Sequence, residues 1–175
     1  RIQQRTAAFQ ESEAKLQAIL KFAPASIYVK NLEGRHILAN EALLKFLGIS
    51  AQELIGKRNE DLFAPDTAAR LTTNDRLVIA AGQVRQFEEE VYLQGQNYTF
   101  LSNKFLLFDQ NHRPYAICSI STDITERKVI QEALKRKEAH LRHIATNIPG
   151  VIFQYMLDPK GQESIVYISD RCQEV

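Results

Sequence analysis

One stretch near residue 120 constrains the fold of this chain more than any other, because the sequence pattern changes there from strand to helix. Residues 114–120 (Pro-Tyr-Ala-Ile-Cys-Ser-Ile) are rich in β-branched and aromatic side chains, which is typical of a β-strand. Asp123 follows this strand, where its carboxylate can cap a helix and Glu126 can reach back to the cap. Beyond it, apolar side chains recur in steps of four and three, as in a coiled-coil seam, with a lysine at one step: Ile130, Leu134, Lys137, Leu141, Ile144 and Ile148. The sequence therefore predicts a last strand that runs directly into a long helix.

The residues before this junction predict two strands, a helical segment and three more strands. We expect the strands at residues 26–30, 35–39, 86–93, 98–108 and 114–120. We expect helical segments at residues 41–47, 50–55, 59–63 and 66–81. Gly34 can adopt a positive φ in the first turn, and Asn40 can cap the first short helix. This order is typical of an α+β fold.

The last strands carry large apolar side chains on both faces, so the sheet needs two covers. We expect the short helices to cover one face and the helix of residues 1–22 to cover the other. A second interpretation makes this N-terminal helix part of a dimer seam, because Ile2, Phe9 and Leu16 are seven residues apart. The sequence leaves both alternatives open.

The run from Asp123 to Arg127 (Asp-Ile-Thr-Glu-Arg) resembles the closing motif of PAS sensor domains, in which an Asp-Ile-Thr junction leads into an output helix. Residues 104–118 are similar to the last two strands of PAS domains from bacterial sensor kinases. The resemblance covers about residues 16–125. It implies a PAS fold: a five-stranded antiparallel sheet with short helices on one face, flanked by N- and C-terminal coiled-coil-like helices.

For function, the resemblance implies a sensory or signal-relay module of a larger bacterial signalling protein, of the sensor histidine kinase type. A ligand- or strain-induced change in the sheet would pass through Asp123, Ile124 and Thr125 into the output coiled coil. A homodimer through the flanking helices and a small-molecule ligand are the partners it implies. A ligand-free dimerisation spacer is the alternative, because large side chains can fill the cavity of such a domain: Phe46, Phe87, Phe100 and Phe105. A small α+β enzyme or carrier is the third candidate.

An internal repeat indicates a second, incomplete copy of this domain. Four apolar or proline positions recur with an offset of 125 residues: Leu16, Ile19, Pro24 and Ile27 match Leu141, Ile144, Pro149 and Ile152. We therefore expect four segments: a signalling or dimer helix (1–22), a PAS domain (23–125), a linker helix (126–147) and the truncated start of a second PAS domain (148–175). Because two strands alone are marginal in water, we expect the strands of the second copy to be disordered or swapped onto a partner.

Composition and charge argue against several classes of protein. A formal net charge of +1 and a pI near 8.0 give no case for nucleic-acid binding. No apolar run approaches the ~20 residues that span a bilayer, and no signal peptide opens the chain. Two cysteines form no disulfide framework. We interpret the chain as a piece of a longer cytoplasmic protein without direct membrane insertion.

The chain has no recognisable catalytic motif. It contains no Gly-x-Ser-x-Gly turn, no phosphate-binding loop and no dinucleotide-binding loop. His140 and His143 have a spacing that could hold a metal on one helix face, but we interpret them as solvated side chains and predict no metal site. This fragment is therefore expected to have no enzymatic activity, although its parent is expected to be a histidine kinase.

The resemblance also identifies candidate site residues, while the identity of any cofactor stays open. Residues 56–62 (Gly-Lys-Arg-Asn-Glu-Asp-Leu) match part of the sequence motif of flavin photosensors but lack the cysteine that forms a bond with the flavin. The helix of residues 66–81 has no histidine for haem, and His36 is expected to be exposed. Glu89 and Lys104 can face each other on adjacent strands, and similar pairs occur in PAS domains; the plainer interpretation is an exposed cross-strand pair of little energetic value. Structural-motif positions are Gly34, Asn40, Glu89 and Lys104, and candidate ligand-pocket positions are Ile27, Val29, Ile37, Phe46, Leu77, Phe87, Val91 and Phe100.

Overall fold

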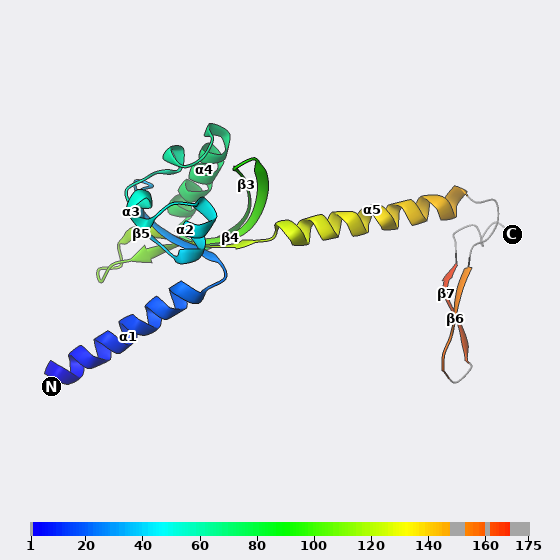
Figure 1. Ribbon diagram of the computed structural model, residues 1–175, viewed down its shortest axis with the longest axis horizontal. Helices are drawn as coiled ribbons and strands as arrows, with labels where there is room; N and C mark the ends of the chain where they lie inside the picture. The colour runs from blue at the N-terminus through cyan, green and yellow to red at the C-terminus, as the bar shows by residue number, and fades with distance from the viewer. Residues whose placement is uncertain (1, 148–152, 160–161, 169–175) are drawn as a thin grey trace. The chain divides into compact units, whose positions relative to one another are not determined.

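A computed structural model of the chain describes residues 2–147, 153–159 and 162–168 (Figure 1). The chain divides into two compact units, residues 1–126 and 127–175, and each is described by itself. The first unit contains α1 (Ile2–Phe22), β1 (Ser26–Asn31), β2 (His36–Ala39), α2 (Glu41–Leu47), α3 (Ala51–Leu54), a 3₁₀ turn η1 (Asn59–Asp61), α4 (Pro65–Ala81), β3 (Arg85–Leu93), β4 (Gln96–Phe108) and β5 (Pro114–Asp123). Two strands, a helical insertion and three strands follow one another as the sequence predicts.

The five strands form one antiparallel sheet in the order β2-β1-β5-β4-β3. The first strand therefore lies next to the last strand, in the middle of the sheet, and the helical insertion spans from the edge strand β2 to the opposite edge strand β3. The predicted α+β class and five-stranded antiparallel sheet are confirmed.

Local signals define the helix ends as expected. Asn40 caps α2, and Gly48 ends this helix with a φ of 70°. Ser50 and Glu53 form a reciprocal capping box at the start of α3. Gly34 adopts a φ of 83° in the turn between β1 and β2, a conformation that glycine reaches without steric cost.

The helices α2, α3 and α4 gather on one side of the sheet (Figure 1), and two apolar clusters fill the space between them. One cluster joins Tyr28 of β1 to α2 and α3 through Leu43, Leu47 and Leu54. The other joins Leu71 of α4 to Val91 and Phe100 on β3 and β4. We call this side of the sheet the inner face.

The outer face carries a third cluster, made by the alternate residues of the same strands. Its buried members are Ile27, Val29, Ala116 and Cys118. Helix α1 was expected to cover this face, but from this part of the described chain Leu20 in its last turn and Ala23, directly after its end, pack there. The earlier side chains Phe9, Leu16 and Ile19 are 59–69% exposed. The cover predicted from α1 is therefore limited to its last turn.

The second unit contains most of α5 (Thr125–Asn147) and an antiparallel hairpin of β6 (Phe153–Leu157) and β7 (Glu163–Ile168). The seam positions Ile130, Leu134 and Leu141 of α5 are 56–65% exposed. The side chains of β6 are exposed. Ile148, Pro149 and Ile152 of the internal repeat lie outside the described residues, and disorder or swapping of the second copy stays a prediction. Within the described ranges, no helix is both long enough and apolar enough to cross a membrane.

Candidate functional site

A cluster of charged side chains lies buried at the centre of the inner face. The ammonium group of Lys30 on β1 lies 2.8 Å from one carboxylate oxygen of Asp75 on α4. The ammonium group of Lys104 on β4 lies 2.7 Å from the other oxygen of Asp75 and 2.8 Å from Glu89 on β3. Both lysine side chains are at most 1% exposed. One helix and three strands are therefore joined by ion pairs whose side chains are at most 9% exposed.

Polar neighbours complete the hydrogen bonding of this cluster. Lys30 also donates to the side-chain oxygen of Asn59 at 2.7 Å, and Asn59 in turn donates to Thr72. Lys104 reaches the hydroxyl of Tyr28 at 3.5 Å, and Asn74 donates to Glu89 at 3.0 Å. A buried ion pair keeps its charges only when such bonds replace the lost hydration.

The charges of this cluster support one another. Burial alone would raise the pKa of Asp75, but the ammonium groups of Lys30 and Lys104 outweigh it and lower the pKa of this carboxyl. Burial likewise opposes the charge of Lys104, but the oxygen of Tyr28 and the carboxylates of Asp75 and Glu89 raise the pKa of its ammonium. Two ammonium groups therefore face two carboxylates, and the charges of the cluster sum to zero.

His36 lies beside this cluster and is buried, with 3% of its surface exposed. The prediction that it is exposed is wrong, because β2 turns this side chain inward against the ring of Tyr28, 5.5 Å away. Burial, and then the charge of Lys30, lower the pKa of His36 to about 4. Its Nδ1 lies 2.9 Å from the carbonyl oxygen of Lys57, which can only accept, so the neutral ring carries its proton on Nδ1.

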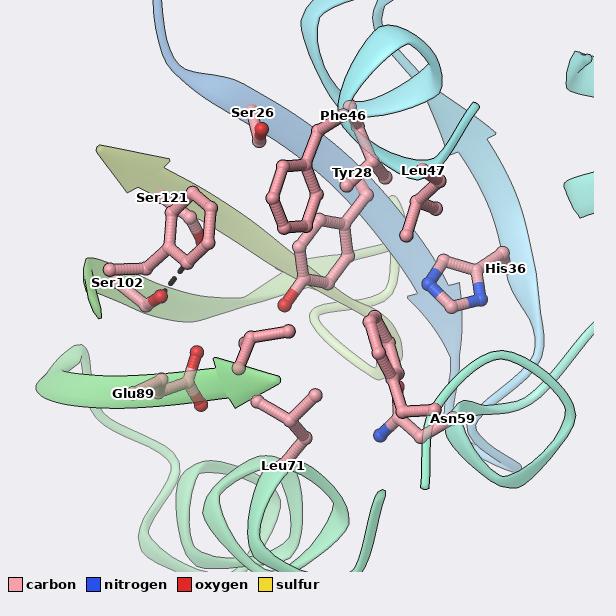
Figure 2. A pocket seen from close by; sticks show the side chains of 14 residues that line it. Ser26, Tyr28, His36, Phe46, Leu47, Asn59, Leu71, Glu89, Ser102 and Ser121 are labelled. Carbon is pink, nitrogen blue, oxygen red and sulfur yellow. Dashed lines mark hydrogen bonds between the residues drawn. The ribbon is translucent and has the colours of Figure 1, made fainter. Parts of the chain in front are cut away.

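A small cavity lies between this cluster and the short helices (Figure 2). It offers about 40 Å³ of space. Its polar lining residues are Ser26, Tyr28, His36, Asn59, Glu89, Ser102 and Ser121, and the hydroxyls of Ser102 and Ser121 bond to each other at 2.8 Å. Its apolar lining residues are Leu43, Phe46, Leu47, Phe63, Leu71, Val91 and Phe100. Polar and apolar side chains are thus mixed around the cavity (Figure 2).

The junction between β5 and α5 is held by four hydrogen bonds, two of which run to β4. The backbone N–H of Ile124 donates to the carbonyl of Thr99 at 2.8 Å, and the N–H of Thr99 donates to the hydroxyl of Thr125 at 2.9 Å. The carboxylate of Asp123 accepts from the backbone N–H of Thr125 at 2.8 Å and also from its hydroxyl. The helix begins at Thr125, and Ile124 is buried. The first turn of α5 is therefore attached to the strand that carries Phe100, Ser102 and Lys104.

Asn40 connects three elements at the same end of the sheet as this junction, since Ser26 at the start of β1 pairs with Ser121 near the end of β5. Its side-chain oxygen accepts from the N–H groups of Leu43 and Ile27, and its amide donates to the carbonyls of Leu20 and Ala25. This one buried side chain therefore joins the end of α1, the start of β1 and the first turn of α2. The cap was expected, but the two bonds to the segment around α1 were not.

The candidate pocket residues fall into three groups. Phe46, Val91 and Phe100 line the cavity. Ile27 and Val29 lie in the cluster on the outer face, because Tyr28 and Lys30 are the β1 residues that face the helices. Ile37, Leu77 and Phe87 do not line the cavity; the first two are 46% and 43% exposed, and Phe87 is half-buried.

The Glu89–Lys104 pair forms, but its environment differs from the expectation. Glu89 is directly opposite Phe100 in the sheet, and Lys104 is opposite Arg85, so the ion pair runs diagonally between β3 and β4. Both side chains are buried instead of exposed. The prediction of an exposed pair is wrong because the inner face, which the short helices cover, carries polar as well as apolar side chains.

Sequence reasoning missed Lys30, Asp75 and Asn59, although a signal was present. Asp75 lies on the same helical stripe as the buried Leu71 and Val78. Lys30 follows Tyr28 by two residues and therefore shares its face. A charge at a core position of a helix and another at a core position of a strand indicate a buried pair. Within the described residues, no group of three or more His, Cys, Asp or Glu side chains could hold a metal ion.

Comparison with known proteins gives consistent matches to sensor domains. A family model described as "PAS fold" matches residues 20–129. The chain is 27% identical over 148 residues to the methanogenesis regulatory histidine kinase FilI of Methanothrix harundinacea, a match that covers 84% of this chain and 17% of that protein. It is 24% identical over 128 residues to the aerobic respiration control sensor protein ArcB of Escherichia coli, covering 73% of this chain and 16% of ArcB. The chain thus spans less than a fifth of the length of these curated relatives.

Among solved structures, the PAS domain of BvgS from Bordetella pertussis aligns with this chain at a TM-score of 0.57 and 25% sequence identity. The alignment covers 74% of this chain and 98% of that domain. The likeness therefore extends over almost the whole of the solved domain.

Proposed function

The chain belongs to the PAS family, because the family model matches residues 20–129, and we propose that it passes a change in its sheet to an output helix as a relay module of a larger sensor histidine kinase. The region is homologous to parts of sensor kinases such as FilI and ArcB. Kinase activity, a cytoplasmic location and a homodimer are parts of this proposal for the whole protein. The fragment itself contributes sensing and relay, and no catalysis.

The observation that carries the relay proposal is the attachment of α5 to β4. Thr99 forms hydrogen bonds with both Ile124 and Thr125. The next residue of β4, Phe100, lines the cavity. Lys104 on the same strand pairs with Asp75 of α4. A shift of β4 relative to α4 therefore displaces the first turn of α5, because a paired strand moves as one element.

The exposed apolar seam of α5 supports signal output through a dimer, in which α5 packs against the same helix of a second copy of the chain. Ile130, Leu134 and Leu141 follow a coiled-coil spacing and are more than half exposed. A helix with an apolar seam gains free energy by burying it against a partner, and a second copy offers the same seam. A rotation or tilt at Thr125 would then change the packing of the two helices.

The size of the cavity favours a relay that works without a large cofactor. About 40 Å³ is room for about three water molecules, whereas pockets for drug-sized ligands enclose about 300–1,000 Å³.

The alternative function, a ligand-free dimerisation spacer, predicts that the sheet has a single conformation and that α5 has a fixed position. The two functions differ in whether changes at the junction alter output.

The test uses the full-length parent kinase. Thr125→Val removes the hydroxyl that accepts from Thr99, and Asp123→Ala removes the carboxylate that accepts from the backbone N–H of Thr125. Thr122→Val is the matched control, since Thr122 is exposed and lies next to the junction. We expect the two junction variants to change autophosphorylation at least several-fold while the control does not, since allosteric couplings are typically about 1–3 kcal/mol. Unchanged output in both junction variants would sink the relay proposal.

A further inference from the structure

The two edges of the five-stranded sheet differ in how they are covered. At the β2 edge, the backbone N–H of His36 donates to the carbonyl of Lys57 at 2.9 Å, and the N–H of Gly56 donates to the carbonyl of His36 at 2.8 Å. The opposite edge is β3, a strand of nine residues that stands last in the sheet order. Figure 1 shows β3 at the margin of the first unit, beside α4. Among the described residues, no further strand pairs with it on that side.

The hydrogen bonds of the neighbouring strand show which backbone groups of β3 point away from the sheet. Glu90 lies opposite Thr99 on β4. Thr99 directs its N–H and its carbonyl to Thr125 and Ile124, and the carbonyl of Glu90 accepts from the guanidinium of Arg70 on α4 at 3.0 Å. Backbone direction alternates along an antiparallel strand, so every second residue of β3 points its N–H and its carbonyl outward. These residues are Gln86, Glu88, Glu90 and Tyr92.

A groove of about 570 Å³ lies between this edge and α4. Ala69, Leu71 and Thr73 of α4 line one side of it, and Glu88 and Glu90 of β3 line the other. A strand added to the edge would alternate its side chains between the two faces of the sheet. Every second side chain would therefore face α4 and the groove, and the others would lie beside the exposed side chains of Glu88 and Glu90.

The charge at this edge selects a basic occupant. The carboxylate of Glu89 is balanced by Lys104, but Glu88 and Glu90 on either side of it are exposed. Arg70 is the one cation among the described residues that line the groove. Pairing of β3 with the same strand of a second copy around Glu88 and Glu90 would set carboxylates against carboxylates, which is destabilising. A strand with lysine or arginine at two positions two residues apart would instead set a cation against each acid.

We propose that the β3 edge binds an extended basic segment of another protein, which adds a strand to the sheet. Its backbone pairs with the outward groups of Glu88 and Glu90, and its two cations lie against the two carboxylates. Arg70 bonds the carbonyl of Glu90 in the unbound chain and is displaced when the segment binds.

This surface lies close to the output junction. Glu90 is opposite Thr99, the residue of β4 that bonds both Ile124 and Thr125. A partner at the β3 edge would therefore act one strand away from the first turn of α5. The inference rests on the proposed function only for this signalling role, and binding itself is independent of whether the junction relays a signal.

The experiment is a nuclear magnetic resonance titration of the isotope-labelled 175-residue chain with the synthetic peptide acetyl-Val-Lys-Val-Lys-Val-amide. We expect saturable shifts of the backbone amides of Gln86, Glu88 and Glu90, at an affinity on the order of millimolar for so short a segment. A first control, acetyl-Lys-Lys-Val-Val-Val-amide, keeps the composition and the charge but lacks the alternation, and should bind about threefold more weakly.

A second control separates strand addition from the attraction of charges. It is the alternating peptide with N-methyl groups on the backbone nitrogens of both lysines. A residue directly opposite Glu88 or Glu90 exchanges backbone hydrogen bonds with it, so these methyl groups remove two donors and leave both cations in place. This peptide should bind at least tenfold more weakly than the alternating peptide.

Two protein variants test the opposing roles of the charged side chains. Glu88→Gln combined with Glu90→Gln removes both acids and should weaken binding of the alternating peptide about tenfold. Arg70→Gln removes the competitor for the carbonyl of Glu90 and should strengthen binding several-fold. Arg70 is exposed, so its replacement should leave the fold intact. Weaker binding by the Arg70 variant would overturn the proposal, because the guanidinium would then belong to the binding surface.

The peptides alone also allow the proposal to fail. Equal binding of the alternating and the N-methylated peptide would overturn it in favour of diffuse attraction between charges. Absence of saturable shifts along β3 would overturn it as well. Shifts at Gln86, Glu88 and Glu90 that depend on dilution of the chain without peptide would assign the edge to a second copy.

A failure of this inference is distinguishable from a failure of the proposed function. The titration measures binding to the fragment, and the kinase assay measures the effect of Thr125→Val in the parent. Peptide binding together with an insensitive junction would leave the docking surface standing and remove the relay. A sensitive junction without peptide binding would leave the relay and remove the docking surface.

Discussion

The ammonium group of Lys104 lies 2.7 Å from the carboxylate of Asp75, and the two side chains are 0% and 9% exposed. This pair joins the middle of β4 to the middle of α4. Because Lys30 binds the other oxygen of the same carboxylate, α4 is anchored to two strands at one point. The position of α4 on the sheet therefore depends on an ionic contact as well as on apolar packing.

Replacing Asp75 by Asn should destabilise the domain strongly, because two ammonium groups would stay buried with less negative charge beside them. Removing one partner of a buried ion pair costs about 3–5 kcal/mol. Urea unfolding followed by circular dichroism measures this loss. Asp66→Asn is the control, since Asp66 is an exposed acid in the first turn of the same helix and should cost less than about 1 kcal/mol. Equal midpoints for the two variants would contradict the anchoring role of Asp75.

Stability should fall as the pH is lowered through the range set by His36. The pKa of this residue is about 4 in the folded chain, against 6.5 for an ordinary histidine in an unfolded chain, so the unfolded state binds the proton first. The contribution of His36 is fully present above about pH 6.5 and is lost as the pH falls towards 4. The loss is on the order of 3 kcal/mol, which chemical denaturation at several pH values can measure. His36→Gln should flatten this dependence, whereas replacement of the exposed His140 should leave it in place.

Asn40→Ala should cost about 2–3 kcal/mol, since it removes a helix cap and leaves the carbonyls of Leu20 and Ala25 without their donor. Asn40→Asp is the informative comparison, because a carboxylate keeps the acceptor for Leu43 and Ile27 but cannot donate. We expect Asp to recover part of the loss. Thermal unfolding of both variants measures it, and a full recovery would show that the bonds to the end of α1 are unimportant.

Thr125→Val should loosen the attachment of α5 in the isolated chain. The amide of Thr99 loses its acceptor, so its hydrogen exchange should become faster by about tenfold, equivalent to the net value of one hydrogen bond. Amide exchange followed by nuclear magnetic resonance measures this residue directly. With Thr122→Val the exchange rate at Thr99 should be unchanged. Slow exchange in the Thr125 variant would mean that β4 and β5 alone protect this amide.

Lys137→Leu should strengthen self-association through α5. Lys137 occupies a seam position between Leu134 and Leu141, and a further leucine in the seam buries more apolar area in a dimer. We expect the dissociation constant of a dimer to fall about tenfold or more in sedimentation equilibrium. Lys135→Leu adds the same side chain away from the seam and should have a smaller effect. Equal effects would indicate non-specific association.

The sequence alone led to the fold because the relevant interactions are local. The alternation of apolar and polar side chains predicted the strands. Asn40, Gly48 and the capping box of Ser50 and Glu53 predicted the helix ends through contacts with residues close to them in the chain. The repeat of apolar residues after Thr125 identified α5. These features need no knowledge of distant residues, because a helix cap and a strand period are complete within one element.

The candidate site could be predicted only in part. Lys104, Phe100 and Glu89 were selected, but Lys30 and Asp75, which lie 45 residues apart, were not. Ile27 and Val29 were assigned to the pocket, but Tyr28 and Lys30 are the residues of β1 that face the helices. Ile27 and Val29 therefore lie on the outer face.

The strand and helix pattern, the caps and the junction motif were thus determined by the sequence itself, through hydrogen bonds and periodicities that span a few residues. The burial of His36, the diagonal pairing of Glu89 with Lys104 and the meeting of Lys30 with Asp75 were decided only by the tertiary structure. The physical reason is that a charge is stable in a protein interior only where packing brings an opposite charge to it. That partner comes from another element, and no local pattern specifies which one.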